Sequence, residues 1–231
     1  MTNLTRFKDV DAWIFDLDNT LYPRSCDLFA QMDVRMTAFI ENLLNLPFDE
    51  ARKIQKDYYR DYGTTLRGLM IEKKINPKDY LDFVHDIDYA PVKDAPDLRA
   101  VLEKLPGRRV IFTNGDVPHA KRTTDRLGIT DLFDHVFDIV ASDLMPKPHR
   151  APYEQFLDVT GIDPTRAAFF EDLPRNLAVP HEMGMRTVLI TDPPTGSVPR
   201  MEWETTISNE DHVHHTTDDL AAFLKQVLEA L

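Results

Sequence analysis

The sequence is poor in cysteine and has no long apolar run. Its single cysteine, Cys26, excludes a disulfide within the chain and therefore a small secreted fold stapled by disulfides. Nowhere do about 18 apolar residues follow one another, which argues against a transmembrane helix. The first residues, MTNLTRFKDVDAWIF, lack the basic segment and apolar run of a signal peptide. We therefore expect a soluble, cytoplasmic protein.

Positive charge is also scarce. The chain has 27 Lys and Arg residues against 39 Asp and Glu residues, which gives a net charge of −12. A field of this sign repels the phosphates of nucleic acids and anionic membrane surfaces, so we expect neither as a partner. A small anionic substrate would need local positive charge, from a bound metal or from a few placed Lys and Arg side chains. The composition is compatible with a monomer or a homodimer.

Five short apolar runs predict a buried sheet. Each run is followed by turn residues and then by a helical pattern, as in parallel strands that are covered on both faces. Strands separated by helices imply right-handed crossovers, and hence an α/β fold with a doubly wound, Rossmann-like, mainly parallel sheet. The predicted strands are 12–15, 110–112, 137–140, 167–170 and 187–190.

A long stretch without a strand signal follows the first run and has the pattern of helices. Its apolar residues recur at every fourth position, with two more that widen the stripe: Leu28, Met32, Met36, Ile40 and Leu44, then Phe39 and Leu43. Asn76 and Pro77 indicate that one helix stops and another begins, because proline is favoured in a first turn. For 231 residues, one core with a sizeable insertion is the simplest organisation. We expect a helical cap domain over 25–88, inserted into an α/β core made of 1–24 and 89–231.

The end of the sequence divides into a loop and a helix. Proline and other turn formers are frequent from Thr191 to Thr205, which predicts a loop. No chemistry is assigned to the segment 191–215. Thr216 stands three residues before Asp219, which predicts a capping arrangement at the start of the last helix. One apolar face of that helix is expected to pack on the core, and it consists of Leu220, Phe223, Leu224, Val227, Leu228 and Leu231.

Two carboxylates follow the first predicted strand. In an open α/β sheet, ligands bind outside the carboxyl ends of the strands. Asp16 and Asp18 are separated by one residue, so in an extended chain both side chains leave the same side of the backbone. Such a pair repels itself unless a cation or a shared proton relieves it, and hard oxygen ligands favour Mg²⁺ over Zn²⁺. The alternative is a solvated turn, because Asp and Asn are common in loops.

A second acidic pair follows the strand at 167–170. Glu171 and Asp172 stand at the end of a strongly apolar run, where an unpaired charge would be costly. Alone, such a pair is commonly a charge at a helix N-terminus or a partner in a salt bridge. Together with Asp16 it offers the remaining metal ligand. Asp172 is the better candidate, and Glu171 would support it or hold metal-bound water.

Basic and polar residues follow the other runs. Lys147 precedes Pro148 in a stiff loop, which would aim its ammonium at a substrate phosphate, although a lone lysine is normally a solvated surface charge. Thr113 and Asn114 carry a hydroxyl and an amide that could bind phosphoryl oxygens. Gly115 would let the backbone approach closely. Read alone, TNG is a turn sequence.

The ordered set of these motifs resembles the haloacid dehalogenase superfamily. The set consists of DLDNT, TNG, KP and EDLPRN, each after its own predicted strand. The resemblance implies that Asp16 is the nucleophile and that Asp18 is the general acid and base. It also implies that Thr113 and Lys147 bind the substrate phosphate. The implied metal ligands, for Mg²⁺, are Asp16, Asp172 and the backbone carbonyl of Asp18.

Longer stretches are similar to the pyrimidine 5'-nucleotidase branch of that superfamily. They are DLDNTLYPRS, DYYRDYGTTLRGL, FTNGD, LGITDLFD and KPHRAPYEQF. This closer resemblance implies a helical cap after the first strand and a nucleoside 5'-monophosphate as substrate. Another small phosphate ester, such as phosphoglycolate or a sugar phosphate, is the alternative. Glu171 departs from the superfamily pattern, because an aspartate commonly stands at this position.

Charge determines the expected chemistry. A phosphate ester repels a carboxylate, so Mg²⁺, Lys147 and backbone N–H groups must neutralise the phosphoryl oxygens before Asp16 attacks. Attack forms an aspartyl-phosphate. Asp18 must first carry a proton for the leaving alcohol and later accept one from water, so we expect its neighbours to raise its pKa.

The helical insertion is expected to close over the site and to contact the leaving group. Tyr62 and Arg67 are the candidate residues for that contact, with ordinary surface placement as the alternative.

Three other functions share the same residues. A dehalogenase would use Asp16 but has no need for the carboxylate of Asp18. A phosphotransferase or phosphomutase would differ only in the group that accepts the phosphoryl group. A non-catalytic binding protein would have kept the fold and lost the activity.

Overall fold

A parallel six-stranded sheet forms the centre of the protein. The computed structural model describes residues 4–191, 201 and 210–231. The strand order is β3-β2-β1-β4-β5-β6, and every neighbouring pair is parallel. The strands are β1 Ala12–Phe15, β2 Arg108–Phe112, β3 His135–Phe137, β4 Ala167–Glu171, β5 Arg186–Ile190 and β6 His215–Thr217. This order confirms the predicted doubly wound α/β fold, because β2 and β3 lie on one side of β1, and β4, β5 and β6 lie on the other.

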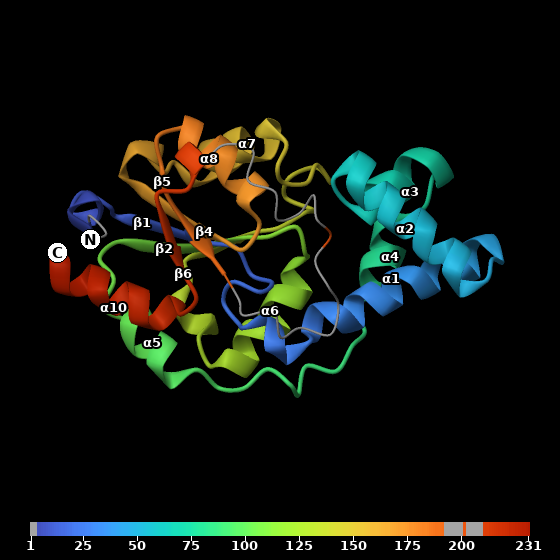
Figure 1. Cartoon of the computed structure of the whole chain (residues 1–231), viewed down its shortest axis with the longest axis horizontal. Helices are drawn as coiled ribbons and strands as arrows, with labels where there is room; N and C mark the ends of the chain where they lie inside the picture. Colours follow the sequence, from blue (N-terminus) through green and yellow to red (C-terminus); the bar gives the residue numbers. More distant parts are fainter. Residues whose placement is uncertain (1–3, 192–200, 202–209) are drawn as a thin grey trace.

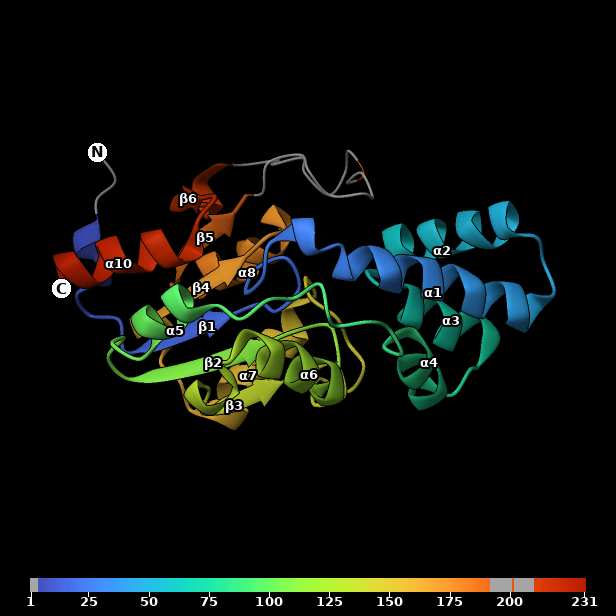
Figure 2. The same cartoon turned by 90° about the horizontal axis from the view of Figure 1, so that it is seen from below.

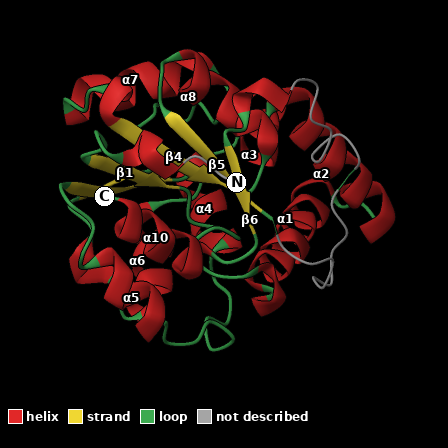
Figure 3. Cartoon of the chain, turned by 60° about the vertical axis from the view of Figure 1, so that its left-hand side comes forward, coloured by secondary structure: helices red, strands yellow, loops and turns green. Residues whose placement is uncertain are grey.

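Helices cover both faces of the sheet (Figure 3). On one face lie α5 Pro96–Leu102, α6 Val117–Leu127 and α10 Leu220–Ala230, and on the other lie α7 Arg150–Thr160 and α8 Ala178–Glu182 (Figure 1). Short 3₁₀ turns are η1 Leu4–Phe7, η2 Arg24–Cys26, η3 Thr130–Leu132, η4 Pro164–Arg166, η5 Pro174–Leu177 and η6 Glu210–His212.

The central strand β1 is buried throughout, and its side chains alternate between two hydrophobic clusters. Trp13 and Phe15 join the cluster beneath α5 and α10, while Ala12 and Ile14 join the cluster beneath α7. The register pairs Ala12 with Arg108 of β2 on one side and with Ala167 of β4 on the other. A continuous apolar run therefore suits this position, since a central strand meets helices on both faces.

The strands predicted at 110–112, 167–170 and 187–190 are one or two residues longer in the structure, and two larger differences concern β3 and β6. The third strand begins at His135 and ends at Phe137, whereas the sequence predicts 137–140. Asp138 accounts for this early end: its carboxylate accepts the backbone N–H groups of Val117 (2.9 Å) and Ala141 (2.8 Å), which turns the chain. The strand β6 was not predicted, because its three residues are polar and give no apolar run.

The chain between β1 and α5 forms a separate helical unit at one end of the sheet (Figure 2). The helices of this helical unit are α1 Leu28–Leu44, α2 Phe48–Tyr62, α3 Thr65–Lys73 and α4 Pro77–Val84. They share their own hydrophobic cluster, built on residues such as Met32, Leu69 and Tyr80, to which Ile139 of the core also contributes. The predicted helical insertion after the first strand is therefore confirmed.

The apolar stripe of α1 is only partly as predicted. Leu28, Met32 and Ile40 are buried, but Leu43 is 42% exposed, so its assignment to the buried stripe was wrong. The buried face instead includes Asp33 and Thr37, which turns it away from Leu43.

Asp33 is a buried carboxylate of α1 that faces α2. It is 1% exposed and receives hydrogen bonds from Arg52 (2.9 Å), Gln55 (2.6 Å) and Lys56 (2.6 Å), all on α2. A buried carboxylate is tolerated when it is paired in this way.

Two helix starts test the predicted caps. Asn76 accepts the N–H of Lys78 (2.9 Å) and Pro77 occupies the first turn of α4, as predicted. At α10 the predicted capping by Thr216 was wrong, because Thr216 belongs to β6 and Asp219 caps the helix by accepting the N–H of Ala222 (2.9 Å).

The predicted face of α10 is buried at Leu220, Phe223, Leu224 and Val227, while Leu231 is 44% exposed. Of the predicted loop over 191–205, residues 192–200 and 202–205 lie outside the described residues. Among the helices in the described ranges, none has the length and apolar character needed to cross a bilayer.

Candidate active site

The carboxyl ends of the central strands meet the helical unit around one cavity of about 160 Å³. The core lines it with residues that follow β1, β2 and β4, and with one residue of the loop before α7. These include the predicted site residues Asp16, Asp18, Thr113, Asn114, Lys147, Glu171 and Asp172. Side chains that are far apart in the sequence are thus brought together at the sheet edge.

Lys147 is buried at the bottom of this cavity. Its side chain is 1% exposed, and its Nζ donates to Asp16 Oδ1 (2.7 Å), Glu171 Oε2 (2.7 Å) and the carbonyl oxygen of Phe112 (2.9 Å). The three acceptors satisfy the three N–H groups of an ammonium. The lysine is therefore a fixed internal cation and not a surface charge.

Burial and charge act in opposite directions on this group. Burial alone would lower the pKa of Lys147, but Asp16 and Glu171 raise that pKa above its ordinary value. Burial raises the pKa of Asp16 to about 7, and the neighbouring charge of Glu171 adds to this rise. The site thus holds an excess of negative charge that Lys147 does not fully relieve.

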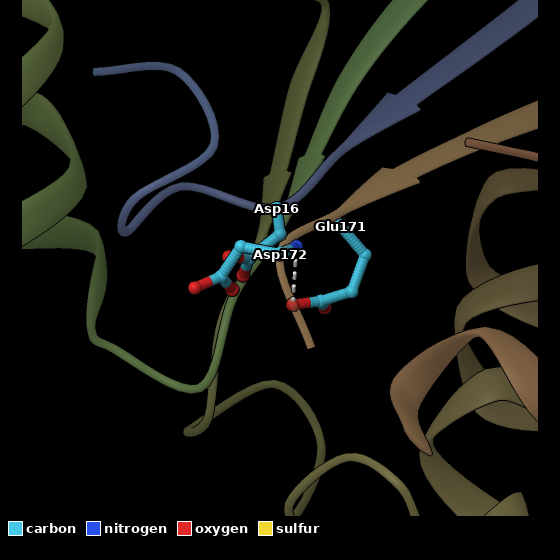
Figure 4. A group of neighbouring side chains, drawn as sticks. All are labelled: Asp16, Glu171 and Asp172. Atoms are coloured by element: carbon cyan, nitrogen blue, oxygen red, sulfur yellow. Dashed lines mark hydrogen bonds between the residues drawn. The ribbon is translucent and has the colours of Figure 1, made fainter. Parts of the chain in front are cut away.

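Asp16, Glu171 and Asp172 form an acidic cluster (Figure 4). Each is buried, and each offers a ligand atom such that these atoms lie within 4.8 Å of one another. Clustered carboxylate oxygens suit a hard cation such as Mg²⁺, and the pKa of Asp16 is raised by burial first and by the charge of Glu171 second. The residues present therefore fit a magnesium ion.

Glu171 differs from the other two carboxylates in how it is used. Its Oε2 accepts from Lys147, while its Oε1 accepts the N–H groups of Asp172 (3.1 Å) and Leu173 (3.2 Å). Although burial raises it, Lys147 holds the net pKa of Glu171 below its ordinary value. Both oxygens are engaged in orienting Lys147 and the turn after β4.

The Asp18 side chain contacts His119 and Tyr22. Its Oδ1 lies 2.8 Å from His119 Nε2 and accepts a hydrogen bond from the Tyr22 hydroxyl at 2.5 Å. Its carboxylate is not in the acidic cluster described above, so the side chain is directed toward His119 and Tyr22 and away from that cluster.

The predicted rise in the pKa of Asp18 was wrong for the site without substrate. Burial raises the pKa, but the charge and hydrogen bond of His119, together with the hydrogen bond of Tyr22, bring it below its ordinary value. The sequence did not reveal His119 as a partner, because it lies 101 residues along the chain from Asp18.

Thr113 and Asn114 occupy the turn after β2. Thr113 is 1% exposed, and its Oγ1 accepts the N–H of Gly115 (2.9 Å). The Asn114 amide binds the backbone of Lys147 at both ends: its oxygen accepts the Lys147 N–H (2.9 Å) and its nitrogen donates to the Lys147 carbonyl (3.3 Å). Asn114 therefore positions the lysine loop, whereas Thr113 lies at the cavity wall.

Tyr62 and Arg67 do not line the cavity. Tyr62 donates to Glu72 on the exposed side of the helical unit, and the charge of Arg67 acts on His149 outside the cavity. The helical unit instead contributes other side chains to the cavity wall, and the sequence pattern did not single out these side chains. The polar ones among them are Asp33, Gln55, Lys56, Tyr59, Thr64, Thr65, Tyr80 and His85.

Two curated proteins are similar to this chain. "Phosphate metabolism protein 8" of Saccharomyces cerevisiae is 31% identical over 196 residues, which are 77% of this chain and 60% of that protein. The chain thus spans about three fifths of that relative. "Glyceraldehyde 3-phosphate phosphatase" of Methanocaldococcus jannaschii is 27% identical over 192 residues, which are 77% of this chain and 83% of that protein.

Solved structures and family models give the wider relationship. An L-2-haloacid dehalogenase from Xanthobacter autotrophicus superposes on this chain with a TM-score of 0.58. The superposition covers 94% of this chain and 98% of that one. Since the identity is only 18%, this similarity is one of fold. The model of the haloacid dehalogenase-like hydrolases matches residues 10–192. This match covers most of the sequence and every residue of the cavity lining contributed by the core. The protein belongs to the haloacid dehalogenase-like hydrolases.

Proposed function

We propose that this hydrolase is a phosphatase, which cleaves phosphomonoesters through an aspartyl-phosphate on Asp16. The observation that carries the proposal is the meeting of Asp16, Asp18 and the buried Lys147 at one cavity. The names of the two curated relatives, a phosphate metabolism protein and a phosphatase, support the same class of substrate.

In the first half of the reaction, a carboxylate oxygen of Asp16 attacks phosphorus and the bond from phosphorus to the alcohol oxygen breaks. Lys147 supplies positive charge beside the phosphoryl oxygens. Asp18 gives its proton to the departing alcohol. Although the pKa of Asp18 is low without substrate, an incoming phosphate raises it, because nearby negative charge favours the protonated carboxyl.

In the second half, water attacks phosphorus and the bond to Asp16 breaks. Asp18, now ionised, accepts the proton that this water loses. Inorganic phosphate leaves, and both carboxyl groups have returned to their starting protonation states.

We assign the magnesium site to Asp16, Asp172 and, as the family resemblance implies, the backbone carbonyl of Asp18. A magnesium ion bound there would neutralise phosphoryl oxygens that the net charge of the site otherwise repels. Lys147 offsets only part of that charge, because one ammonium lies among the three carboxylates of Asp16, Glu171 and Asp172.

We assign residues 25–88 as a cap over the core made of 1–24 and 89–231. Gly63 supports this assignment, because it lies against the loop that carries Lys147: a Cβ at Gly63 would stand 3.3 Å from Pro146 Cγ. The helical unit also contributes much of the cavity wall, including the apolar side chains of Phe29, Met32 and Leu81. Closure of such a unit would exclude water from the reacting groups.

For the substrate we propose a nucleoside 5'-monophosphate. A wall of this kind suits a leaving group with a large apolar surface, such as a nucleoside with its base. A small polar ester, such as phosphoglycolate or glyceraldehyde 3-phosphate, would leave the apolar part of that wall without contacts.

Release of inorganic phosphate across UMP, CMP, AMP, GMP, phosphoglycolate and glyceraldehyde 3-phosphate tests this, with added Mg²⁺ and with EDTA. We expect metal-dependent turnover that is fastest on a nucleotide. Turnover on the small esters alone would replace the nucleotide by the alternative substrates. Assays with sugars as acceptors measure any phosphotransferase activity.

Asp16→Asn tests the nucleophile. The amide has the same size but is a poor nucleophile, so we expect turnover to fall by about 10³-fold or more. The wild-type enzyme, mixed with ³²P-labelled ester and quenched, should carry a label that hydroxylamine removes, and the variant should not. Equal labelling of both proteins would exclude Asp16. No turnover by the folded wild-type protein on any ester would favour a binding protein.

A further inference from the structure

We propose that His119 is a positioning residue, which holds Asp18 in the orientation needed for proton transfer to the leaving alcohol. The inference rests on the proposed phosphatase function. His119 lies in the first turn of α6, and its side chain is fully buried. It touches Asp18 and not the acidic cluster, so it acts on the reaction through Asp18.

The two hydrogen bonds to Asp18 reach the same oxygen. His119 Nε2 lies 2.8 Å and the Tyr22 hydroxyl 2.5 Å from Oδ1. No hydrogen bond from the described residues reaches Oδ2, and Asp18 lines the cavity. Fixing one oxygen from two sides therefore leaves the other oxygen aimed at the substrate, as a general acid requires.

His119 is itself held on several sides. Its Nδ1 lies 2.9 Å from the Tyr89 hydroxyl, and its ring stacks on His85 with centroids 4.5 Å apart and planes inclined by 12°. Its backbone N–H donates to Asp116 Oδ1 (2.9 Å), which also lies 3.0 Å from His85 Nδ1. An imidazole restrained in this way loses little freedom when it binds Asp18, which is the condition for positioning.

These contacts join the two connections between the core and the helical unit. Tyr22 lies on the segment that leads into the helical unit. His85 follows α4, and Tyr89 lies on the returning segment. The orientation of Asp18 therefore depends on both connections being in place. A displacement of the helical unit would be transmitted to the proton donor through His119.

A leaving-group comparison distinguishes positioning from simple packing. An alkyl ester such as a nucleotide needs a proton from Asp18 as its alcohol departs, whereas 4-nitrophenolate leaves without one. The quantity to measure is kcat/KM, since it reports the steps through formation of the phosphoenzyme. We expect His119→Ala to lower kcat/KM about 100-fold on the best alkyl ester and only about fivefold on 4-nitrophenyl phosphate.

Two further variants keep the test decisive. His119→Gln retains an N–H near the position of Nε2. Its kcat/KM on the alkyl ester should be at least tenfold higher than that of His119→Ala. Tyr89→Phe removes the hydroxyl beside Nδ1 and should give a smaller loss with the same preference for the alkyl ester. It also covers the case in which His119→Ala fails to fold. The matched control is Thr123→Val, a buried change on the same helix, which should affect both esters equally and weakly.

Equal losses on both esters for the His119 variants and for Tyr89→Phe would overturn the inference. In that case, wild-type turnover and the loss of the label in Asp16→Asn would leave the phosphatase proposal standing. Absence of turnover in the folded wild-type protein would overturn both.

Discussion

At the scale of single residues, the Lys147 ammonium has the strongest constraints. It is buried between two carboxylates and a carbonyl oxygen, and its backbone is bound by the Asn114 amide. A buried cation is stable only when such partners surround it. Its removal would leave Asp16 and Glu171 as unpaired buried charges.

Lys147→Met should therefore destabilise the protein by about 3 kcal/mol in the absence of metal, as expected when one partner of a buried ion pair is lost. It should also lower kcat and raise KM, because the ammonium acts on both bound substrate and transition state. Denaturant unfolding in EDTA measures the first effect and steady-state kinetics the second. The control is Lys121→Met, whose exposed pair with Asp125 should change stability by less than about 0.5 kcal/mol. A variant as stable as the wild type would contradict this account of the site.

The residue scale also separates what the sequence could and could not predict about the site. Asp16, Thr113, Lys147 and Asp172 follow strands of one parallel sheet, so their meeting at one edge follows from the predicted fold. His119 gave no such signal, because it lies inside a helix and its contact with Asp18 depends on how that helix packs. The pKa of Asp18 was misjudged for the same reason.

At the scale of elements, helix starts differ in how well sequence spacing identifies the cap. Asn76 precedes a proline and was predicted correctly, since Pro77 fixes where α4 begins. At α10 the residues Thr216, Thr217 and Asp219 are all competent caps. The pairing of β6 with β5 decides among them, because it places Thr216 in the sheet. The local sequence pattern cannot predict this choice, because it depends on pairing with a strand that lies elsewhere in the sequence.

Asp219→Ala should lower the free energy of unfolding by about 1 kcal/mol, because it removes the acceptor for the Ala222 N–H. Thr216→Ala serves as the comparison, since Thr216 is exposed and caps nothing; it should change stability by less than about 0.5 kcal/mol. Thermal and urea unfolding of the two variants measure the difference. A larger loss for Thr216→Ala would restore the cap predicted from sequence.

At the scale of the whole molecule, the acidic cluster links stability to pH and to magnesium. Burial and the charge of Glu171 raise the pKa of Asp16 to about 7 from its ordinary value of 3.8. Between these values the folded protein holds a proton on Asp16 that the unfolded chain has lost, so the contribution of Asp16 to the stability of the metal-free protein should fall as pH rises through this window. The lowered pKa of Glu171 acts below pH 4.5, at the acidic end of this window, and the raised pKa of Lys147 acts above it.

Magnesium binds the ionised carboxylates, so its stabilising effect should grow over the same range. We expect the increase in Tm on adding Mg²⁺ to be larger at about pH 8.5 than at about pH 5.5, since ligand stabilisation follows affinity. Thermal unfolding in Mg²⁺ and in EDTA at both pH values measures it. Asp172→Asn, which keeps the side-chain volume, should remove most of the increase. A Tm increase that is independent of pH would show that Asp16 does not take part in binding the metal.

The placement of β1 has a consequence for how the chain reaches its native state. This strand appears early in the sequence, yet its neighbours in the sheet arrive much later: Ala12 pairs with Arg108 and with Ala167. During synthesis, the apolar segment from Ala12 to Phe15 must therefore wait for β2 to pair with one of its edges, and its other edge stays unpaired until β4 has emerged from the ribosome. A nascent chain interrupted before β4 would keep one edge of its central strand open, and is the form of this protein most in need of a chaperone.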